Sequence, residues 1–158
     1  MAGIWIYSED IIIAQQMLTL GRELAGKMDK QVCALTINEK DAETLIYAGA
    51  DKVIALKGNN PWPESYTEGM AKLAKEQTPD VIFVGATLRG KDLAAKMAAS
   101  LKVGLITDAQ AVRFIDGAIE TERMLYGGLA GLTEVLSGTN IVTIPPCTYA
   151  TPVLYSSR

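Results

Sequence analysis

The stretch DVIFVGATLRGKDLAAKMAASL, from Asp80 to Leu101, carries the pattern that decides the fold. Its first part, DVIFVG, is a short and almost wholly apolar run, which is typical of a buried strand. Its last part repeats apolar residues at the spacing of one helix face, at Leu93, Ala94, Met97, Ala98 and Leu101. The stretch therefore predicts a buried strand, a turn that contains glycines and a helix that packs on the sheet.

The turn itself resembles a phosphate-binding loop but departs from it at one position. Gly85 to Lys91 spells G-x-x-x-x-G-K, and Asp92 stands where the pattern needs a Ser or Thr hydroxyl for magnesium. A carboxylate in the first helical turn would lie close to bound phosphates and repel them. Such loops also usually follow the first strand of a domain, whereas this one follows the fourth. We therefore predict that this turn does not hydrolyse nucleoside triphosphates.

Two interpretations of this turn remain open. In the structural one, Thr87 or Asp92 caps free N–H groups at the start of the helix, and a carboxylate there favours the positive end of the helix dipole. In the binding one, Thr87, Arg89, Gly90 and Lys91 lie at the carboxyl end of a parallel strand, where open α/β sheets bind ligands. A helix N-terminus beside two cations is also suited to an anion, such as a phosphate, a nucleotide or an acidic partner surface.

Strand-like and helix-like segments alternate along the first two thirds of the chain. Three apolar runs precede the quoted stretch, at Gly3–Tyr7, Gln31–Ile37 and Lys52–Leu56, and stretches with helical spacing follow each of them. Four strand–helix units in a row predict a parallel sheet that is covered by helices on both faces. The expected fold class is therefore α/β, a three-layer α/β/α sandwich with a Rossmann-like, mostly parallel sheet.

The pattern changes after Leu101. Asp116-Gly117 separates two strand-like runs, Ala109–Ile115 and Ala118–Tyr126, and such a pair predicts a β-hairpin. A third strand-like piece follows at Leu132–Leu136, and Asn140–Pro145 has the pattern of a last core strand. We expect one domain over residues 1–158, with a C-terminal β-hairpin region.

Two segments are candidate contact surfaces. Tyr126–Gly138 is punctuated by glycines, and its strands would leave an unpaired edge that invites a partner chain. A homodimer would cover such an edge as readily as another protein would. Trp62 lies in a loop between two prolines, where an exposed aromatic side chain can anchor a partner.

Composition excludes several classes of function. The net charge of the 158 residues is −3 with no basic stripe, so we expect no nucleic-acid partner. No apolar run reaches the roughly 18 residues of a membrane span, and no signal-like segment opens the chain; we expect a cytoplasmic protein with no membrane partner. The chain has no histidine, and Cys33 and Cys147 lie far apart, so we expect no metal site. No set of nucleophile and base indicates an enzyme.

Polar residues at other strand ends add to the candidate site. Ser8–Asp10 follows the first strand at the same predicted sheet edge, where Ser8 or Asp10 can cap a helix or line a crevice. Asp108 can accept a hydrogen bond from Lys91 or Arg89 across that edge, as an ion pair.

The quoted stretch and the residues after it resemble a known family, the N-terminal domain of the electron-transfer flavoprotein alpha subunit. The similar motifs are Gly85-Ala86-Thr87, Gly90-Lys91-Asp92-Leu93, Ile106-Thr107-Asp108, RMLYGGLAGLTEV (Arg123–Val135), IVTIPPCTY (Ile141–Tyr149) and GADKVIAL (Gly49–Leu56). This resemblance covers nearly the whole chain and assigns the G-x-x-x-x-G-K match to a turn without a triphosphate role.

The resemblance implies a docking role. In that family this domain is mainly a platform in a heterodimer, a second domain holds most of the FAD, and the AMP site belongs to the beta subunit. Because this chain stops at Arg158, we expect it to bind no cofactor alone, with FAD possible only together with a partner. Pro145-Pro146 replaces the arginine that the family usually carries in its last strand, which puts in doubt the partner contact that this arginine would make.

Two functions follow from these observations. The first is a non-catalytic docking or assembly module in flavin-linked electron transfer, with a beta-like subunit or a second copy of the chain as partner. The second is a binding protein for a nucleotide or another anionic small molecule, which uses Thr87–Lys91 with Ser8 and Asp108 nearby.

Overall fold

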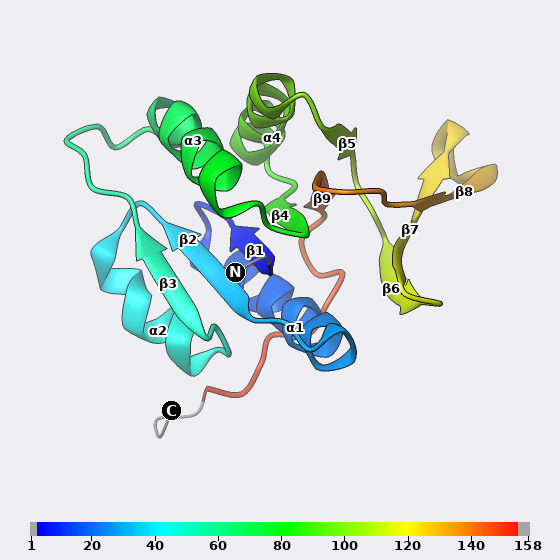
Figure 1. The fold of residues 1–158 in the computed structure, drawn as a ribbon, viewed down its shortest axis with the longest axis horizontal. Helices are drawn as coiled ribbons and strands as arrows, with labels where there is room; N and C mark the ends of the chain where they lie inside the picture. The colour runs from blue at the N-terminus through cyan, green and yellow to red at the C-terminus, as the bar shows by residue number, and fades with distance from the viewer. Residues whose placement is uncertain (1–2, 155–158) are drawn as a thin grey trace.

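The computed structural model describes residues 3–154 and has the predicted α/β class (Figure 1). A six-stranded parallel sheet carries helices on both faces, and a three-stranded antiparallel sheet projects from one end of the molecule. The elements in chain order are β1 (Ile4–Tyr7), α1 (Ile11–Met28), β2 (Val32–Thr36), η1 (Glu39–Asp41), α2 (Ala42–Tyr47), β3 (Lys52–Ala55), η2 (Pro63–Tyr66), α3 (Thr67–Gln77), β4 (Val81–Gly85), α4 (Leu88–Leu101), β5 (Gly104–Ile106), β6 (Ala111–Ile115), β7 (Ala118–Leu125), η3 (Tyr126–Gly128), β8 (Ala130–Val135) and β9 (Asn140–Ile144).

The order of the parallel sheet is β3-β2-β1-β4-β9-β5. Strands β1 and β4 are neighbours in register, with Tyr7 opposite Val84 at their carboxyl ends. From β1 the chain crosses through α1 to β2 on one side, and from β4 it crosses through α4 to β5 on the other side. The crevice between the ends of β1 and β4 is therefore the switch point of the sheet, where open α/β sheets bind ligands.

The helices form two layers because the central strands are apolar on both faces. Every residue of β1, β2 and β4 is buried, as expected for strands that are covered on both sides. Helices α1 and α2 pack on one face, and α3 and α4 pack on the other (Figure 1). Trp5 is in the core between β1 and the α3–α4 layer, as its place in the first strand predicts.

The small sheet confirms the predicted hairpin. Asp116 and Gly117 connect β6 to β7 with positive φ angles of 50° and 84°, the backbone that a tight two-residue turn needs. Strand β8 pairs with β7 and completes the order β6-β7-β8. Val112 and Ile119 attach this sheet to α1, since they belong to the same buried cluster as the α1 residues. Strand β8 begins at Ala130, two residues before the predicted start.

One strand escapes the sequence analysis. Gly104–Ile106 forms the short strand β5, which pairs with β9 at the edge of the parallel sheet. Strand β9 thus lies between β4 and β5, although the small sheet separates it from both along the chain.

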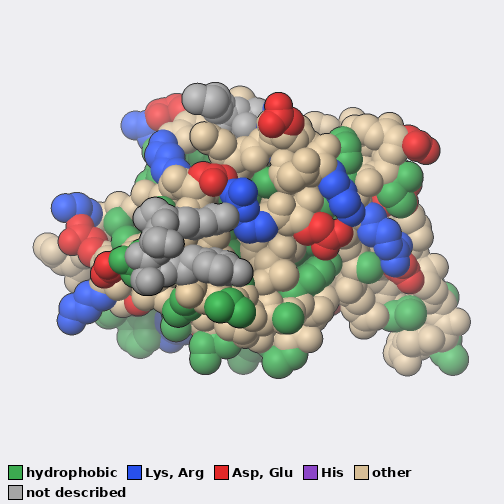
Figure 2. Space-filling view, turned by 90° about the horizontal axis from the view of Figure 1, so that it is seen from below, with side chains coloured by type: hydrophobic (Ala, Val, Ile, Leu, Met, Phe, Trp, Pro, Cys, Tyr) green, Lys and Arg blue, Asp and Glu red, His purple; other side chains and the backbone are tan. Residues whose placement is uncertain are grey.

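The charged side chains are mixed in sign. On the face drawn in Figure 2, Lys and Arg are interspersed with Asp and Glu, so the described side chains form no basic stripe there. Within residues 3–154, the helices are too short or too polar to cross a membrane.

Candidate functional site

The candidate site lies at the carboxyl edge of β1 and β4, where two helices begin. Asp10 caps α1, because its carboxylate accepts hydrogen bonds from the N–H groups of Ile12 (2.8 Å) and Ile13 (3.3 Å). Ser8 does not cap the helix; its hydroxyl accepts from the Asp10 N–H at 3.1 Å. Of the two predicted caps of α1, the structure selects Asp10.

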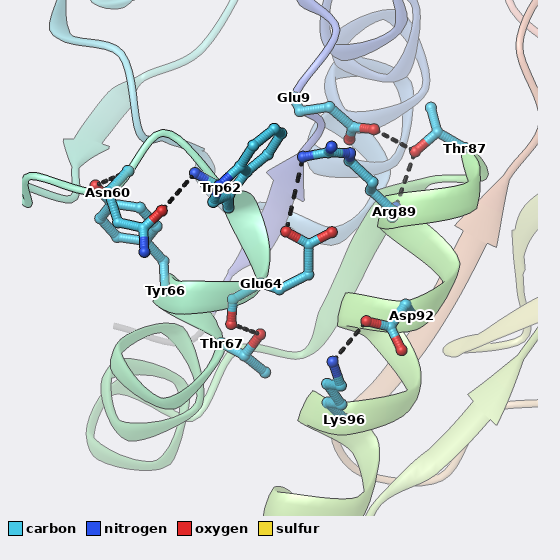
Figure 3. Close-up of polar contacts among 11 residues, drawn as sticks. Glu9, Asn60, Trp62, Glu64, Tyr66, Thr67, Thr87, Arg89, Asp92 and Lys96 are labelled. Carbon is cyan, nitrogen blue, oxygen red and sulfur yellow. Dashed lines mark hydrogen bonds and ion pairs between the residues drawn. The ribbon is translucent and has the colours of Figure 1, made fainter.

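At the start of α4 the cap is Thr87, not Asp92. The Thr87 hydroxyl accepts from the Gly90 N–H at 2.8 Å and donates its hydrogen to a Glu9 carboxylate oxygen (Figure 3). Glu9 comes from the loop after β1, so this contact ties the two sides of the switch point together. It also places a negative charge of the chain itself near the positive end of the α4 dipole.

The two glycines of the turn allow backbone and side chains to approach closely. A Cβ atom at Gly90 would lie 1.9 Å from the carbonyl oxygen of Gly85, and one at Gly85 would lie 2.6 Å from the Ser8 hydroxyl oxygen. The first turn of α4 therefore packs against the end of β4 at a distance that only glycine permits. Close packing accounts for the G-x-x-x-x-G spacing without a bound phosphate.

Both cations of the turn have partners within the chain. The Arg89 guanidinium lies 4.2 Å from the centre of the Trp62 ring and 3.8 Å from a Glu64 oxygen, between Trp62, Glu64 and Glu9 in Figure 3. The Lys91 ammonium lies 2.8 Å from an Asp108 oxygen, which confirms the expected pair across the edge.

Asp92, the residue that breaks the phosphate-loop pattern, is paired as well. Its carboxylate lies 2.6 Å from the Lys96 ammonium, one turn further along α4. A bound anion at the turn would compete with Glu9 for the helix end, with Glu64 for Arg89 and with Asp108 for Lys91. The anion site formed by Ser8, Thr87, Arg89, Gly90, Lys91 and Asp108 stays a prediction, with little support from this geometry.

A crevice of about 340 Å³ opens beside the switch point. Its walls come from the loops after β1 and β2, from the loop before η2 and from α4. The lining residues are Ser8, Glu9, Thr36, Ile37, Asn38, Asp41, Pro61, Pro63 and Arg89. The structure thus brings Ser8 and Arg89 of the predicted site together, and it places Lys91 and Asp108 outside the crevice.

Two buried side-chain oxygens have no hydrogen-bond partner: the second carboxylate oxygen of Glu9, which lines the crevice, and the hydroxyl of Tyr7, which does not line it. Burial raises the pKa of Tyr7 well above its ordinary value, and the nearby charges of Glu9 and Glu64 raise it further. Sequence analysis missed Tyr7, Asp41 and Glu64. The available signal for Tyr7 was its place as the last residue of β1.

A second group of residues stands out at the end of the small sheet. Met124, Tyr126 and Leu129 are exposed around the η3 turn that joins β7 to β8, and we call them the tip surface. Tyr126 and Leu129 belong to the segment Tyr126–Gly138 that the sequence predicts as a contact surface, and Met124 lies just before it; the contact itself stays a prediction.

The sequence model of the electron transfer flavoprotein domain matches residues 13–153. This chain belongs to the electron transfer flavoprotein family. The chain is 29% identical to the electron transfer flavoprotein subunit alpha of Clostridium acetobutylicum over 99% of its length, which covers 47% of that protein. It is 34% identical to the alpha subunit of Bacillus subtilis over 73% of this chain and 37% of that protein.

A third relative comes from Escherichia coli strain K12 and carries the name of an electron transfer flavoprotein subunit, YdiR. It is 35% identical over 77% of this chain and 40% of that protein. The chain therefore spans less than half the length of these electron transfer flavoprotein relatives. Its resemblance to the alpha subunit, first indicated by the G-K-D-L and T-D motifs, is confirmed.

Flavoprotein membership raises the question of whether FAD fits the crevice. The diphosphate of FAD carries negative charge, and the described crevice presents the carboxylates of Glu9 and Asp41 beside a single guanidinium that Glu64 already pairs. The residues present therefore do not fit the diphosphate. That this chain binds no FAD without a partner stays a prediction.

Proposed function

We propose that this chain is a non-catalytic docking module in flavin-linked electron transfer, and that its partner is a beta-type electron transfer flavoprotein subunit. Family membership and the similarity to proteins named as alpha subunits support this proposal. The chain has no histidine, the commonest general base, which also favours a role in assembly over a role in chemistry.

The observation that carries the proposal is the tip surface. The side chains of Tyr126 and Leu129 are 80% and 88% exposed at the same turn, with Met124 beside them on β7. Large apolar side chains gathered at one exposed point favour contact with another protein. Aromatic residues such as Tyr126 are the most frequent anchors of such contacts.

The backbone at the tip supports the same role. Tyr126 has a φ of 53°, in the left-handed region that residues other than glycine rarely adopt, and Gly127 and Gly128 continue the turn with positive φ. This conformation costs on the order of 1 kcal/mol at Tyr126, and it presents the ring outward. A strained backbone at an exposed turn favours a functional reason for the outward position of the Tyr126 ring.

Strand β8 offers a second means of contact next to the tip. It pairs with β7 and is the last strand of its sheet, so its other side exposes unpaired N–H and C=O groups. Val135 on this strand is also exposed. A partner strand could extend the sheet at β8 while its side chains cover the tip.

The proposal can be tested by measuring the affinity of the chain for a beta-type subunit from the same organism by calorimetry. Tyr126→Ser with Leu129→Ser should weaken binding about 10- to 100-fold, because two anchor side chains are lost. Ile12→Ser with Leu88→Ser is the matched control, since both side chains are apolar and exposed but lie at the starts of α1 and α4, outside the small sheet.

Two results would contradict the proposal. One is the absence of a complex with the beta-type subunit at micromolar concentrations. The other is an unchanged affinity in the tip variant. If the chain alone forms a dimer that the tip variant converts to a monomer, the tip joins two copies of this chain, and the partner assignment is wrong.

A further inference from the structure

Trp62 is a large aromatic residue that the fold holds in place at the surface. It is 54% exposed and lies at the rim of the switch-point crevice, since its neighbours Pro61 and Pro63 line that crevice. The two prolines restrict the backbone around it, and the Asn60 side-chain oxygen accepts a hydrogen bond from the Trp62 N–H at 3.0 Å. The Tyr66 hydroxyl then donates to the Asn60 carbonyl at 2.8 Å. The loop that carries Trp62 is therefore ordered before any partner binds.

The Trp62 ring is held as well. The Arg89 guanidinium stacks on it, 4.2 Å from the ring centre, and a Glu64 oxygen lies 3.8 Å from that guanidinium (Figure 3). Arg89 covers one face of the ring, so the other face is open. Leu88, the first residue of α4, is 92% exposed directly before Arg89. An exposed tryptophan that loses little freedom on binding is a favourable anchor for another protein.

The crevice at this surface favours a positive charge. The charged residues that line it are Glu9, Asp41 and Arg89, so carboxylates outnumber the single guanidinium, which Glu64 also pairs. The Asp41 side chain makes no capping hydrogen bond to α2, and within residues 3–154 it takes part in no ion pair. Lys40, the residue before it, is exposed but does not line the crevice. Asp41 is therefore an acceptor that a cation from outside can use.

We propose that Trp62 and the crevice beside it form a docking surface for a segment of a second protein, one that carries a Lys or Arg side chain next to an apolar residue. The cation enters the crevice and donates to Asp41, and the apolar residue packs on the open face of Trp62 and on Leu88. A volume of about 340 Å³ is at the small end of ligand sites, which suits one long side chain better than a cofactor.

Charge and position decide the kind of partner. An acidic segment or an anionic lipid surface would be repelled by Glu9 and Asp41. A small cation alone would fill the crevice and leave Trp62 uncovered. The surface is at the carboxyl edge of the parallel sheet, apart from the tip surface, so the proposal does not depend on the docking role of the tip.

A phage-displayed library of random short peptides, selected on the whole chain, tests the proposal. Some selected peptides should bind the wild-type chain and lose binding to the Trp62→Ser variant, and these should share a Lys or Arg next to an apolar residue. Circular dichroism checks that Trp62→Ser keeps the fold, as expected for a side chain that is half exposed.

Fluorescence anisotropy with one such peptide, synthesised with a dye, then locates the contacts. Trp62→Ser should weaken binding at least about tenfold, and Asp41→Asn about three- to tenfold. Replacing the peptide's cation by glutamine should have the same effect as Asp41→Asn, and the two changes together should cost no more than either alone, because they remove one contact. Raising the salt concentration from about 0.05 M to about 0.5 M should weaken binding of the wild type.

Two matched controls should leave the affinity unchanged. Glu76→Gln removes one negative charge at the exposed far end of α3. Ile115→Ser removes a partly exposed apolar side chain from β6.

Three outcomes would overturn the proposal. The first is that no selected peptide depends on Trp62. The second is that the peptides that depend on Trp62 carry no Lys or Arg, which would make the charge assignment wrong. The third is that the effects of Asp41→Asn and of the peptide substitution add, which would mean that the cation does not contact Asp41.

Discussion

Gly90 and Gly26 both lie within helices, but a methyl group would meet different surroundings at the two positions. At Gly90 it would overlap the carbonyl oxygen of Gly85, and at Gly26 it would meet nothing within 4 Å. We expect Gly90→Ala to lower the free energy of unfolding by about 3 kcal/mol or more, because backbone atoms would have to move. Gly26→Ala should raise it by about 0.5–1 kcal/mol, since alanine loses less entropy in a helix.

Urea unfolding of the two variants measures both effects. The pair is matched, because each change adds the same methyl group to a helix and affects the unfolded chain equally. Equal effects at the two positions would show that the contact between α4 and the end of β4 does not decide the need for glycine. The G-x-x-x-x-G pattern would then need another explanation.

The sequence could predict a contact between two side chains at the site where both residues follow the ends of neighbouring strands. The Lys91–Asp108 pair was expected from the sequence, and the structure has it. The choice of Thr87 over Asp92 as the cap of α4 was not, because both residues suit the first turn and only the backbone geometry decides. Glu64 was missed because its loop reaches the crevice only after the chain has folded.

At the scale of elements, the strands and turns that were predicted correctly are those with a strong local sequence pattern. The almost wholly apolar runs of β1, β2 and β4 and the Asp116-Gly117 turn carry strong local signals, and each predicted the right element. Strand β5 has only Gly104–Ile106 to signal it, which is too short for a period to appear. The position of β9 between β4 and β5 depends on long-range packing, which no local pattern reports.

The segment after β9, residues 145–154, connects α1 to the small sheet, which its sequence did not predict. It runs back along α1, where the Thr19 hydroxyl donates to the Ala150 carbonyl at 2.7 Å. The Tyr149 hydroxyl then accepts from the N–H of Val112 on β6 at 3.1 Å. A side chain of this segment therefore takes up a backbone donor at the edge of the small sheet.

Tyr149→Phe measures how much this hydrogen bond contributes to the stability of the protein. The Val112 N–H is part-buried, and leaving it without an acceptor should lower the free energy of unfolding by about 1–3 kcal/mol. Urea unfolding gives the loss, and hydrogen exchange at the Val112 amide should become faster. Tyr47→Phe is the control, because that hydroxyl contacts Glu43 at the surface, and its loss should cost less than about 0.5 kcal/mol. Unchanged exchange at Val112 would show that water replaces the tyrosine oxygen.

At the scale of the whole molecule, the two sheets share one core. Val112 and Ile119 of the small sheet belong to the same buried cluster as Ile4 and Met17 of the parallel sheet and its helix α1. Figure 1 shows the small sheet projecting from the end of the fold, which would suit a separate unit. Because the cluster is shared, we expect the two sheets to unfold together; that residues 1–158 form one domain stays a prediction.

Ile119→Ala, a substitution in the small sheet, tests whether the two sheets unfold together. If the sheets unfold together, the loss of the Ile119 side chain from the shared cluster should lower the stability of the parallel sheet as well, by about 2–5 kcal/mol. Trp5 reports on that sheet, and a Trp62→Phe background makes it the chain's single tryptophan. The fluorescence transition of Trp5 in urea should therefore shift to lower concentration.

The control for this experiment is Ile115→Ala, since Ile115 lies on β6 but is 40% exposed and outside the cluster. It should shift the Trp5 transition much less than Ile119→Ala. Coincident transitions by Trp5 fluorescence and by circular dichroism would agree with one cooperative unit. A Trp5 transition that stays in place while the amides of β7 lose their protection would mean that the small sheet unfolds on its own. The tip surface would then belong to a small sheet that unfolds independently of the parallel sheet. Binding of a partner at the tip would stabilise the small sheet without any effect on the crevice at the switch point.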